Sequence, residues 1–306
     1  MSARAAWHST DIVARISRIG AKASIVAPNC LRLAAYSRAA RDYAASRKQF
    51  GATIDNLAPI REILATMSVE CQAARALTYY AAKNVDLETG LTRKFETLKG
   101  SPDAPAVRTR MKLVGAFNKM LTPMAKYYGS EMSMRNAMSA ISVLGGSGYM
   151  KDYPVERYLR DSRITTIYEG TSQLQVVAAV AGVTGGLVKD VLVDVFGKAD
   201  WQGEHPRMTA LLADLDAAIE YAKGREDTRT YMDLSARKLV DAGIALVVAG
   251  LFAQMSLKYP EKGKALMHWM MTEFPRVKAG LEQVKSGYAG SVDDFETLAP
   301  SVPVMD

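Results

Sequence analysis

The feature of this 306-residue chain that most constrains its fold is a seam of small and apolar residues that begins after about residue 54. Successive members are four and three residues apart, the spacing that places side chains on one face of an α-helix. They are Ile60, Leu64, Met67, Cys71, Ala74, Thr78, Ala81 and Val85. A long helix with small residues on its contact face packs lengthwise against other helices, so the sequence predicts a helical bundle.

Two further long helices flank this seam. Residues 21 to 48 are rich in alanine and have no proline after Pro28, which predicts a helix that ends at Phe50-Gly51. Residues 105 to 140 predict the other, whose methionine-rich face is more typical of a packed core than of a cofactor site. Glycines and a proline interrupt the segment 86 to 105, where we expect a surface connection with about one helical turn. The predicted fold class is all-α, with an up-and-down bundle.

The residues after about 185 predict a second helical module. Glycines at 182 to 186 interrupt the apolar pattern, and helical runs follow over 187–196, 206–222, 228–257 and 261–285. We therefore divide the chain into an N-terminal extension (1–20), a first bundle (21–185), an additional helical module (186–285) and a tail (286–306). The apolar stretch 242–253 is too short to cross a bilayer, so we expect a buried helix and no membrane span.

Cysteine and histidine usage argues against a disulfide framework and against a metal centre. The chain has two cysteines, both within apolar helical patterns, and three scattered histidines without ligand spacing. Any redox chemistry would therefore use an organic cofactor. The net charge of +7 attracts anionic partners, yet basic and acidic residues are interspersed and form no compact stripe, which disfavours nucleic-acid binding. The opening residues lack a secretory signal, and we expect a cytoplasmic protein.

One carboxylate stands in an unusual local setting. Glu169 lies between a hydroxyl-rich turn that starts at Thr165 and the beginning of a new helix, and Gly170 frees the backbone beside it. Ser172 and Gln175 have the spacing of a capping box, which would satisfy the free N–H groups of that helix. Local chemistry leaves two interpretations open: a reacting group on a loop before a helix N-terminus, or a solvated glutamate before an ordinary capped helix.

A glycine cluster, Gly145-Gly146-Ser147-Gly148, ends the third long helix. It is neither a dinucleotide-binding fingerprint nor a phosphate-binding loop, because it follows a helix rather than a strand and lacks the required glycine and lysine spacing. Closely spaced glycines let a backbone approach a phosphate or an aromatic ring, and they equally suit a tight turn between helices. Both interpretations stay open from the residues alone.

Three segments occur in a fixed order along the chain. They are Arg47-Lys48-Gln49-Phe50-Gly51, Leu144-Gly145-Gly146-Ser147-Gly148-Tyr149 and Ile167-Tyr168-Glu169-Gly170-Thr171-Ser172-Gln173. The segments Tyr153-Pro154-Val155-Glu156-Arg157 and Arg160-Asp161-Ser162-Arg163-Ile164 lie between the second and the third. This order closely resembles the C-terminal helical domain of the acyl-CoA dehydrogenases over about residues 21 to 183. The additional module resembles an appended helical region of the longer family members.

The resemblance implies an activity and a catalytic base. Members of this family remove a proton from the α carbon of an acyl-CoA thioester and pass hydride from the β carbon to the flavin of FAD. Glu169 matches the base of many members, and its backbone N–H matches a donor to the thioester oxygen, while Tyr168 and Gly170 line the same substrate pocket. A carboxylate buried against flavin and acyl chain gains basicity, because burial disfavours its charged form.

The other motifs match residues that bind FAD. By resemblance, Arg47 reaches the diphosphate, Phe50 packs nearby, and Gly145-Gly146 allows the close approach of main chain to the adenosine half at a subunit interface. Thr171 and Gln173 match residues that hydrogen-bond the cofactor. The simpler roles also stay open, since Arg47 could compensate a helix C-terminus and Thr171 could cap a helix.

The chain also departs from the family pattern. Ser142 stands in place of a glutamine, Leu57-Ala58 in place of a His-Gln pair, and the helical and β-domains that normally come first do not precede residue 21. We therefore expect a component of an FAD-dependent acyl-CoA dehydrogenase that needs a partner chain for those domains. It would assemble as a homo- or hetero-oligomer and pass electrons to an electron-transferring flavoprotein. The alternatives are a non-catalytic helical assembly module or gene fragment and, third, a nucleic-acid-binding relative.

Overall fold

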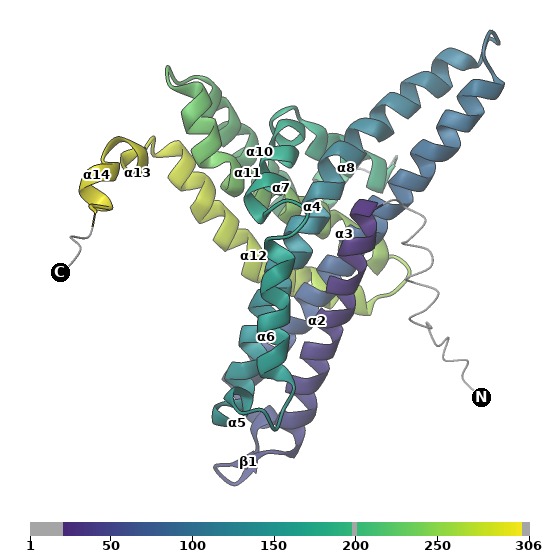
Figure 1. The fold of residues 1–306 in the computed structure, drawn as a ribbon. Helices are drawn as coiled ribbons and strands as arrows, with labels where there is room; N and C mark the ends of the chain where they lie inside the picture. The colour runs from purple at the N-terminus through teal and green to yellow at the C-terminus, as the bar shows by residue number, and fades with distance from the viewer. Residues whose placement is uncertain (1–20, 198–200, 302–306) are drawn as a thin grey trace, which may run out of the picture.

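Helices dominate the architecture. In the computed structural model, residues 21–197 and 201–301 are described, and the predicted extension 1–20 lies outside them. Nearly all of the described residues are helical, and the sheet structure among them is one pair of two-residue strands (Figure 1). The prediction of an all-α fold is therefore confirmed.

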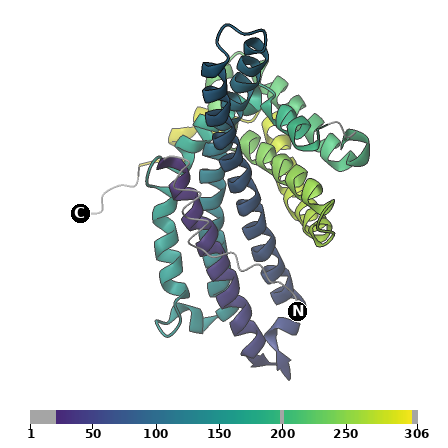
Figure 2. The ribbon, with the colours of Figure 1, turned by 90° about the vertical axis from the view of Figure 1, so that its right-hand side faces the viewer.

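Four helices form the predicted up-and-down bundle, which Figure 2 shows from the side. In the view of Figure 1 the chain runs down, up, down and up again through α2 (Ala21–Ser46), α3 (Ala58–Thr97), α4 (Ala104–Leu144) and α6 (Val155–Arg163). Helix α4 is central, because α2, α3 and α6 all pack against it. The predicted seam of α3 is buried from Leu64 to Ala81. On the predicted face of α4, Met138 is the exception, since its side chain is 57% exposed.

Helix α3 is longer than the sequence predicted. The segment 86 to 105, expected to be a surface connection, continues the helix to Thr97, and a hairpin of α3 and α4 projects beyond the other helices (Figure 1). The two helices still touch there, since Thr92 Oγ1 donates to Met111 Sδ at 3.5 Å and Asn118 Nδ2 donates to Glu88 Oε2 at 2.6 Å. One exposed glycine costs a helix only about 1 kcal/mol relative to alanine, which is too little to end it.

The end of α2 also differs from the prediction. The helix ends at Ser46, and the chain then forms a hairpin of β1 (Lys48–Gln49) and β2 (Ala52–Thr53) instead of a glycine-stopped helix. Phe50 and Gly51 make its two-residue turn, with φ angles of 54° and 85°. Positive φ at both central positions is what a type I′ hairpin turn requires.

Short elements connect the long helices. They are η1 (Ile54–Asn56) after the hairpin, α5 (Gly146–Tyr149) after α4, and η2 (Ile164–Thr166) after α6. Pro154 is the N-cap residue of α6, directly before its first residue. Helix α6 is joined to α2 by a 2.8 Å hydrogen bond between the hydroxyls of Tyr36 and Ser162. This bond holds the end of α6, which directly precedes η2 and the turn after it.

The second module has the helices predicted for it, over nearly the same residues. They are α8 (Leu187–Phe196), α10 (Pro206–Lys223), α11 (Thr228–Ser256) and α12 (Glu261–Lys285), with the one-turn α9 (Trp201–Glu204) before α10. Helix α7 (Ser172–Thr184) joins the modules, because it packs against both α4 and α11. One apolar core extends from Cys30 in the bundle to Ala289 beyond α12, so the two modules share it.

Helix α11 is the centre of the second module. By length and composition it could cross a membrane, contrary to the prediction that its apolar stretch is too short, but 78% of its most apolar window is buried inside the protein. Among the other described helices, only α7 and α8 pass the same test, and only as one span bent by 75°. Burial on this scale fits the predicted role of α11 as a core helix.

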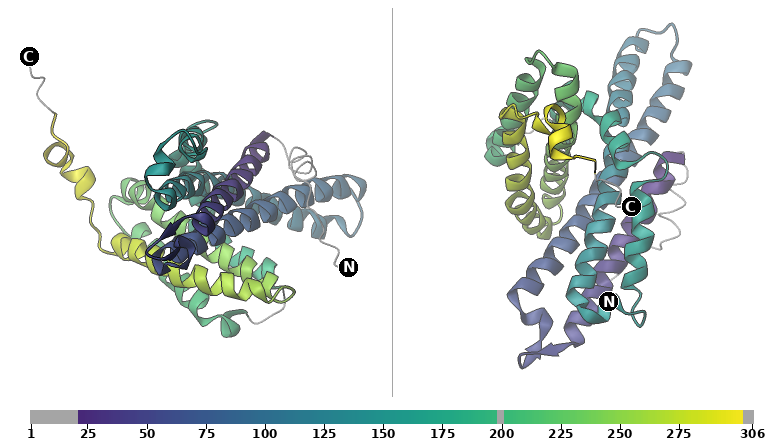
Figure 3. Two further views of the ribbon diagram at one scale, coloured as in Figure 1. Left: turned by 90° about the horizontal axis from the view of Figure 1, so that it is seen from below. Right: turned by 60° about the vertical axis from the view of Figure 1, so that its left-hand side comes forward.

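The segment predicted as a tail carries two short helices within its described part. These are α13 (Gly290–Asp293) and α14 (Phe295–Leu298), and residues 302–306 lie outside the described residues. Figure 3 shows both helices standing away from the rest of the molecule beyond the end of α12. Their short length leaves them dependent on local hydrogen bonds, such as those from the Asp294 and Ala299 backbone N–H groups.

Candidate functional site

Glu169 lies in a strained turn between η2 and α7. Its φ angle is +50°, and that of Gly170 is +91°, so two consecutive residues adopt left-handed conformations. Among the described residues, Phe50 is the one other non-glycine residue with positive φ. Such conformations cost about 1 to 3 kcal/mol and concentrate at functional sites. Gly170 cannot be replaced freely, because a Cβ there would also meet Gln175 Nε2 at 2.7 Å.

Side chains from α4 and α7 hold this turn by its carbonyl groups. Lys126 Nζ donates to Thr165 O at 2.8 Å and to Gly170 O at 2.9 Å. From the other side, Gln175 Nε2 donates to Glu169 O at 3.1 Å and to Gly170 O at 3.4 Å. The main chain on both sides of Glu169 is thereby fixed to two helices.

The helix after the turn is capped differently from the prediction. Thr171, not Ser172, is the N-cap residue of α7, and its Oγ1 accepts a hydrogen bond from Leu174 N at 3.4 Å. Ser172 instead donates to the Glu131 carboxylate of α4, and Gln175 bonds the turn carbonyls. The capping-box prediction was therefore wrong, because Ser172 donates to a carboxylate of another helix and Gln175 donates to the carbonyls of the preceding turn. The simple capping role left open for Thr171 is present.

Tyr168 and Lys126 form the inner wall of the turn. The Lys126 ammonium lies 5.6 Å from the centre of the Tyr168 ring, within the range of a cation–π contact. Lys126 is only 3% exposed. Burial lowers the pKa of this lysine, while the negative charges of Glu131 and Glu169 act in the opposite direction. Burial also raises the pKa of Tyr168, opposed by the positive charge of Arg32 on α2.

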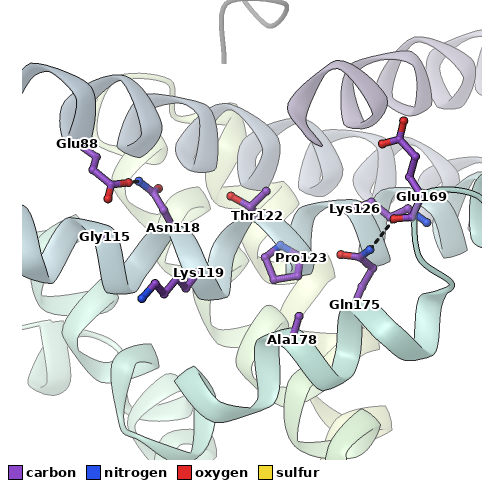
Figure 4. Close-up of a pocket in the computed structure, with 10 residues that line it drawn as sticks. All are labelled: Glu88, Gly115, Asn118, Lys119, Thr122, Pro123, Lys126, Glu169, Gln175 and Ala178. Atoms are coloured by element: carbon purple, nitrogen blue, oxygen red, sulfur yellow. Dashed lines mark hydrogen bonds between the residues drawn. The ribbon is translucent and has the colours of Figure 1, made fainter. Parts of the chain in front are cut away.

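A pocket of about 500 Å³ lies beside the turn, between α3, α4 and α7 (Figure 4). The polar residues of its lining are Glu88, Asn118, Lys119, Thr122, Lys126, Glu169 and Gln175. Glu169 contributes its main chain to this pocket, whereas its carboxylate points away from the other labelled side chains in Figure 4. The exposed carboxylate and the pocket therefore lie on different sides of the turn.

The Arg47 and Gly145-Gly146 segments meet at the other end of the bundle. Tyr43 of α2 links them, since its hydroxyl donates to Ser147 Oγ at 3.3 Å and its ring meets the Tyr153 ring at a centroid distance of 5.4 Å. Next to this contact is a shallow pocket of about 310 Å³ that Tyr43 and Tyr153 line together. Arg47 is exposed, and no carboxylate of the described residues pairs with it.

The three glycines of the cluster have different physical roles. Gly145 ends α4 with a φ of +61°. A Cβ on Gly148 would lie 2.8 Å from Ile141 O, so this glycine allows α5 to pack on α4. No described atom lies within 4 Å of a Cβ placed on Gly146, so the main chain there is open to an external group. The tight-turn interpretation holds for two of these residues, and the close-approach interpretation is compatible with Gly146.

The predicted site residues thus form two separate groups. Tyr168, Glu169 and Gly170 share the strained turn with Thr171 and Gln173, both of which are exposed. The group at Arg47, Phe50 and Gly145-Gly146 lies at the far end of α4. Lys126 and Gly145 are nineteen positions apart on that helix, which corresponds to about 28 Å at 1.5 Å per residue. One chain therefore does not bring the two groups together.

Lys126 is the principal residue that sequence reasoning missed. A signal was present, because Lys126 lies on the same helical face as the small residues Gly129, Ser130 and Ser133, which permit close packing of other segments. A lysine on such a face needs an acceptor.

No group of three or more metal-ligating side chains comes together in residues 21–197 and 201–301.

The fold and the two groups define an all-helical domain that carries a carboxylate on a strained turn. The family model of the acyl-CoA dehydrogenase C-terminal domain matches residues 19–101 and 104–183, which is more than half of the chain. The chain therefore belongs to the acyl-CoA dehydrogenase family, and the resemblance inferred from the three motifs is confirmed.

Individual relatives support the same assignment over the first module. The probable acyl-CoA dehydrogenase fadE25 of Mycobacterium leprae is 33% identical over 157 residues, which is 51% of this chain and 32% of that protein. An acyl-CoA dehydrogenase of Bacillus subtilis is 38% identical over 135 residues, 44% of this chain and 28% of that protein. The chain thus spans about a third of the length of the curated relatives it matches.

Solved structures extend the similarity of fold to the second module. An acyl-CoA dehydrogenase from Bacillus anthracis, complexed with FAD, superposes with a TM-score of 0.62 at 16% identity over 97% of this chain and 55% of that one. The protein ACDH-11 of Caenorhabditis elegans, in complex with C11-CoA, superposes with a TM-score of 0.59 at 19% identity over 92% of this chain and 48% of that one. At these identities the similarity concerns the fold alone.

Proposed function

We propose that this chain is the C-terminal helical part of an FAD-dependent acyl-CoA dehydrogenase and that Glu169 is its catalytic base. The observation that carries the proposal is the backbone of Glu169, which is held at a φ of +50° by hydrogen bonds to the carbonyls of residues 165, 169 and 170. An ordinary solvated glutamate before a capped helix needs no such support. The carboxylate itself is exposed, as expected of a group that meets a substrate from outside the chain.

Residues of this chain accept the proton and bind the thioester in the proposed reaction. The Glu169 carboxylate accepts the α proton of the acyl-CoA thioester, and the Glu169 backbone N–H donates to the thioester oxygen, where negative charge develops. Tyr168 and Gly170 line the substrate side of the turn. FAD, when bound, supplies the acceptor for the hydride that leaves the β carbon. In the assembled site the substrate, the cofactor and further protein segments would enclose the carboxylate.

The exposed residues at the far end of the bundle fit a cofactor. Phe50 is 90% exposed at the tip of its hairpin, Arg47 has an unpaired positive charge beside it, and Gly146 leaves open main chain nearby. These groups suit an aromatic ring and a diphosphate. We propose that they bind the adenosine half of an FAD whose flavin half lies against Thr171 and Gln173 of another copy, because one chain separates the two groups by about 28 Å along α4.

The proposal includes an assembly. The segments that complete the site come from a partner chain or from a longer form of this one, and oligomers juxtapose the two groups. An electron-transferring flavoprotein is the proposed acceptor and the cytoplasm the proposed location. Sedimentation of the purified chain with FAD and the candidate partner is expected to give an oligomer, whereas a persistent monomer without flavin absorbance would contradict the shared site.

The test of the base is the substitution Glu169→Gln. The amide keeps the size of the side chain but accepts no proton at neutral pH, so acyl-CoA-dependent dye reduction by the assembled enzyme is expected to fall by about 100-fold or more. The control is Glu156→Gln, since Glu156 pairs with Arg160 on the surface of α6 and is expected to leave turnover unchanged. Full turnover of the Glu169→Gln enzyme would refute the assignment. Absence of turnover in every assembly, with normal folding, favours a non-catalytic module.

A further inference from the structure

Lys126 occupies a position that neither packing nor a surface role explains. It is a lysine on the central helix α4, 97% buried, and its ammonium is directed at main-chain oxygens. Burying an unpaired ammonium in protein is costly, and charged lysines inside proteins are retained only where specific partners hold them. Its hydrogen-bond acceptors here are two carbonyl groups of one turn.

The two carbonyls that accept from Lys126 lie on opposite sides of Glu169. Thr165 O is the acceptor on the η2 side, and Gly170 O is the acceptor on the α7 side. One ammonium thus ties together the two ends of the segment that carries the carboxylate. Because the residues between them include the positive φ angles of Glu169 and Gly170, loss of the tie would let the segment relax to ordinary backbone conformations.

The Lys126 ammonium also affects which way the Tyr168 and Glu169 side chains point from the turn. The Tyr168 ring lies over it at 5.6 Å, and both the ring and the turn carbonyls are on the inner side. With that side filled, the Glu169 carboxylate is left on the outer side, away from the pocket that Lys126 and Gln175 line (Figure 4). Gln175 alone cannot supply this tie, because its amide reaches the carbonyls of Glu169 and Gly170 but not that of Thr165.

We propose that Lys126 is the positioning residue of the Glu169 turn, acting through Thr165 O and Gly170 O to hold the carboxylate on the substrate side. The inference rests on the proposed function of Glu169 for its consequence in catalysis. The contact between Lys126 and the turn does not depend on that function, and its effect on the turn can be measured in the folded chain without turnover.

The first experiment is hydrogen exchange on the full chain, with mass-spectrometric analysis of peptides that cover residues 164–175. Lys126→Met removes the donors and keeps the aliphatic stem, and it is expected to speed exchange of these amides by about tenfold or more. The matched control is Lys119→Met, since Lys119 is an exposed lysine of the same helix and lines the same pocket. Unchanged exchange in Lys126→Met, or equal acceleration in the control, would overturn the proposal.

Rescue by a small amine separates positioning from general stability. Lys126 lines the pocket beside the turn, so Lys126→Ala opens a path for ethylammonium to the two carbonyls. Millimolar ethylammonium is expected to restore slow exchange in Lys126→Ala and to have no effect on the wild-type chain. If Lys126→Met does not fold, Lys126→Gln keeps an amide NH2 group as a neutral donor and is expected to show intermediate protection. Uniform loosening of all of α4 and α7 without rescue would assign Lys126 to stability and contradict the inference.

A double-mutant cycle in the assembled enzyme tests the catalytic consequence. A residue that acts through Glu169 is expected to lower kcat in Lys126→Met with little change in KM, and to have no further effect in a Glu169→Gln background. Independent, multiplicative losses would contradict positioning. If Glu169→Gln retains full turnover while Lys126→Met still loosens the turn, the function proposed for Glu169 fails, and the tie between Lys126 and the turn remains.

Discussion

Phe50 and Glu169 share a backbone conformation that is unfavourable for residues with a side chain. For Glu169 the surrounding hydrogen bonds explain how the conformation persists. For Phe50 the explanation is the type I′ turn of the β1–β2 hairpin, which demands positive φ but normally has Asn or Gly at that position. A phenylalanine that is 90% exposed at such a tip contributes little to the chain's own stability. Its proposed contribution is to cofactor binding.

Replacing Phe50 is therefore expected to change the stability of the chain and its affinity for FAD in opposite directions. Phe50→Asn suits the turn and should raise the free energy of unfolding by about 0.5 to 1 kcal/mol, measured by urea denaturation. FAD affinity of the assembled protein, measured by flavin fluorescence, should fall. The control is Tyr149→Asn, which removes an aromatic ring that is 81% exposed but not at positive φ, and which should give no stabilisation. A destabilised Phe50→Asn chain would show that the ring packs on the hairpin.

At this scale the motifs located the turn but not what holds it. Glu169, Gly170 and Thr171 could be identified from adjacent residues, whereas the lysine that fixes them is 39 and 44 positions away from its acceptors. The capping-box prediction failed for the same reason, because Ser172 prefers the Glu131 carboxylate of another helix. Local spacing rules cannot report a partner that only the packed bundle brings close.

Two glycines inside long helices, Gly90 and Gly182, have different surroundings: one is open to solvent, and the other lies against a neighbouring helix. Gly182 was predicted to mark a break between modules, but it lies inside α7, where a Cβ would meet the Met120 side chain of α4 at 2.8 Å. Gly90 was predicted to lie in a surface connection, but it lies inside α3 with no described atom within 4 Å of its Cβ position. Sequence alone predicted that the long helices exist, although α2 and α3 end at other residues than expected. It could not distinguish these two glycines, because the difference between them lies on the opposing helix.

These two glycines give a matched pair of substitutions to alanine. Gly182→Ala should lower the free energy of unfolding by about 1 to 3 kcal/mol, because the added methyl forces α4 and α7 apart. Gly90→Ala should raise it by about 0.5 to 1 kcal/mol, since alanine stabilises an exposed helix interior. Both changes are measurable by urea denaturation followed by circular dichroism. Equal effects of the two substitutions would contradict the close contact between α4 and α7.

The whole molecule is joined across its modules by polar as well as apolar contacts. Arg135 of α4 pairs with Glu70 of α3 and, at 3.3 Å, with Glu273 of α12, and both carboxylates are almost completely buried. Burial raises the pKa of Glu70, with Arg135 opposing this effect. Buried ion pairs are costly when one partner is removed, so this group ties the second module to the bundle. Sequence patterns predicted the helices of both modules but gave no measure of how tightly the modules associate.

A shared core predicts that the two modules unfold together. The apolar cluster runs without interruption from the bundle through α7 into α11 and α12, so exposure of one module removes the support of the other. Trp201 and Trp269 both lie in the second module and are almost completely buried. Once Trp7 is replaced by phenylalanine, tryptophan fluorescence therefore reports the second module and, through the contact of Trp269 with Tyr128, its interface with α4. Circular dichroism at 222 nm reports the helices of both.

Urea denaturation of the Trp7→Phe chain should therefore give one transition with the same midpoint by both probes, as in two-state unfolding. Glu273→Gln, which removes one of the two carboxylates that pair with each of Arg135 and Arg276, should lower that common midpoint without separating the two curves. The control is Glu282→Gln, whose carboxylate pairs with Lys285 on the surface of α12 and should shift neither curve. A fluorescence transition that precedes the circular dichroism transition would show instead that the second module unfolds independently of the bundle that carries Glu169.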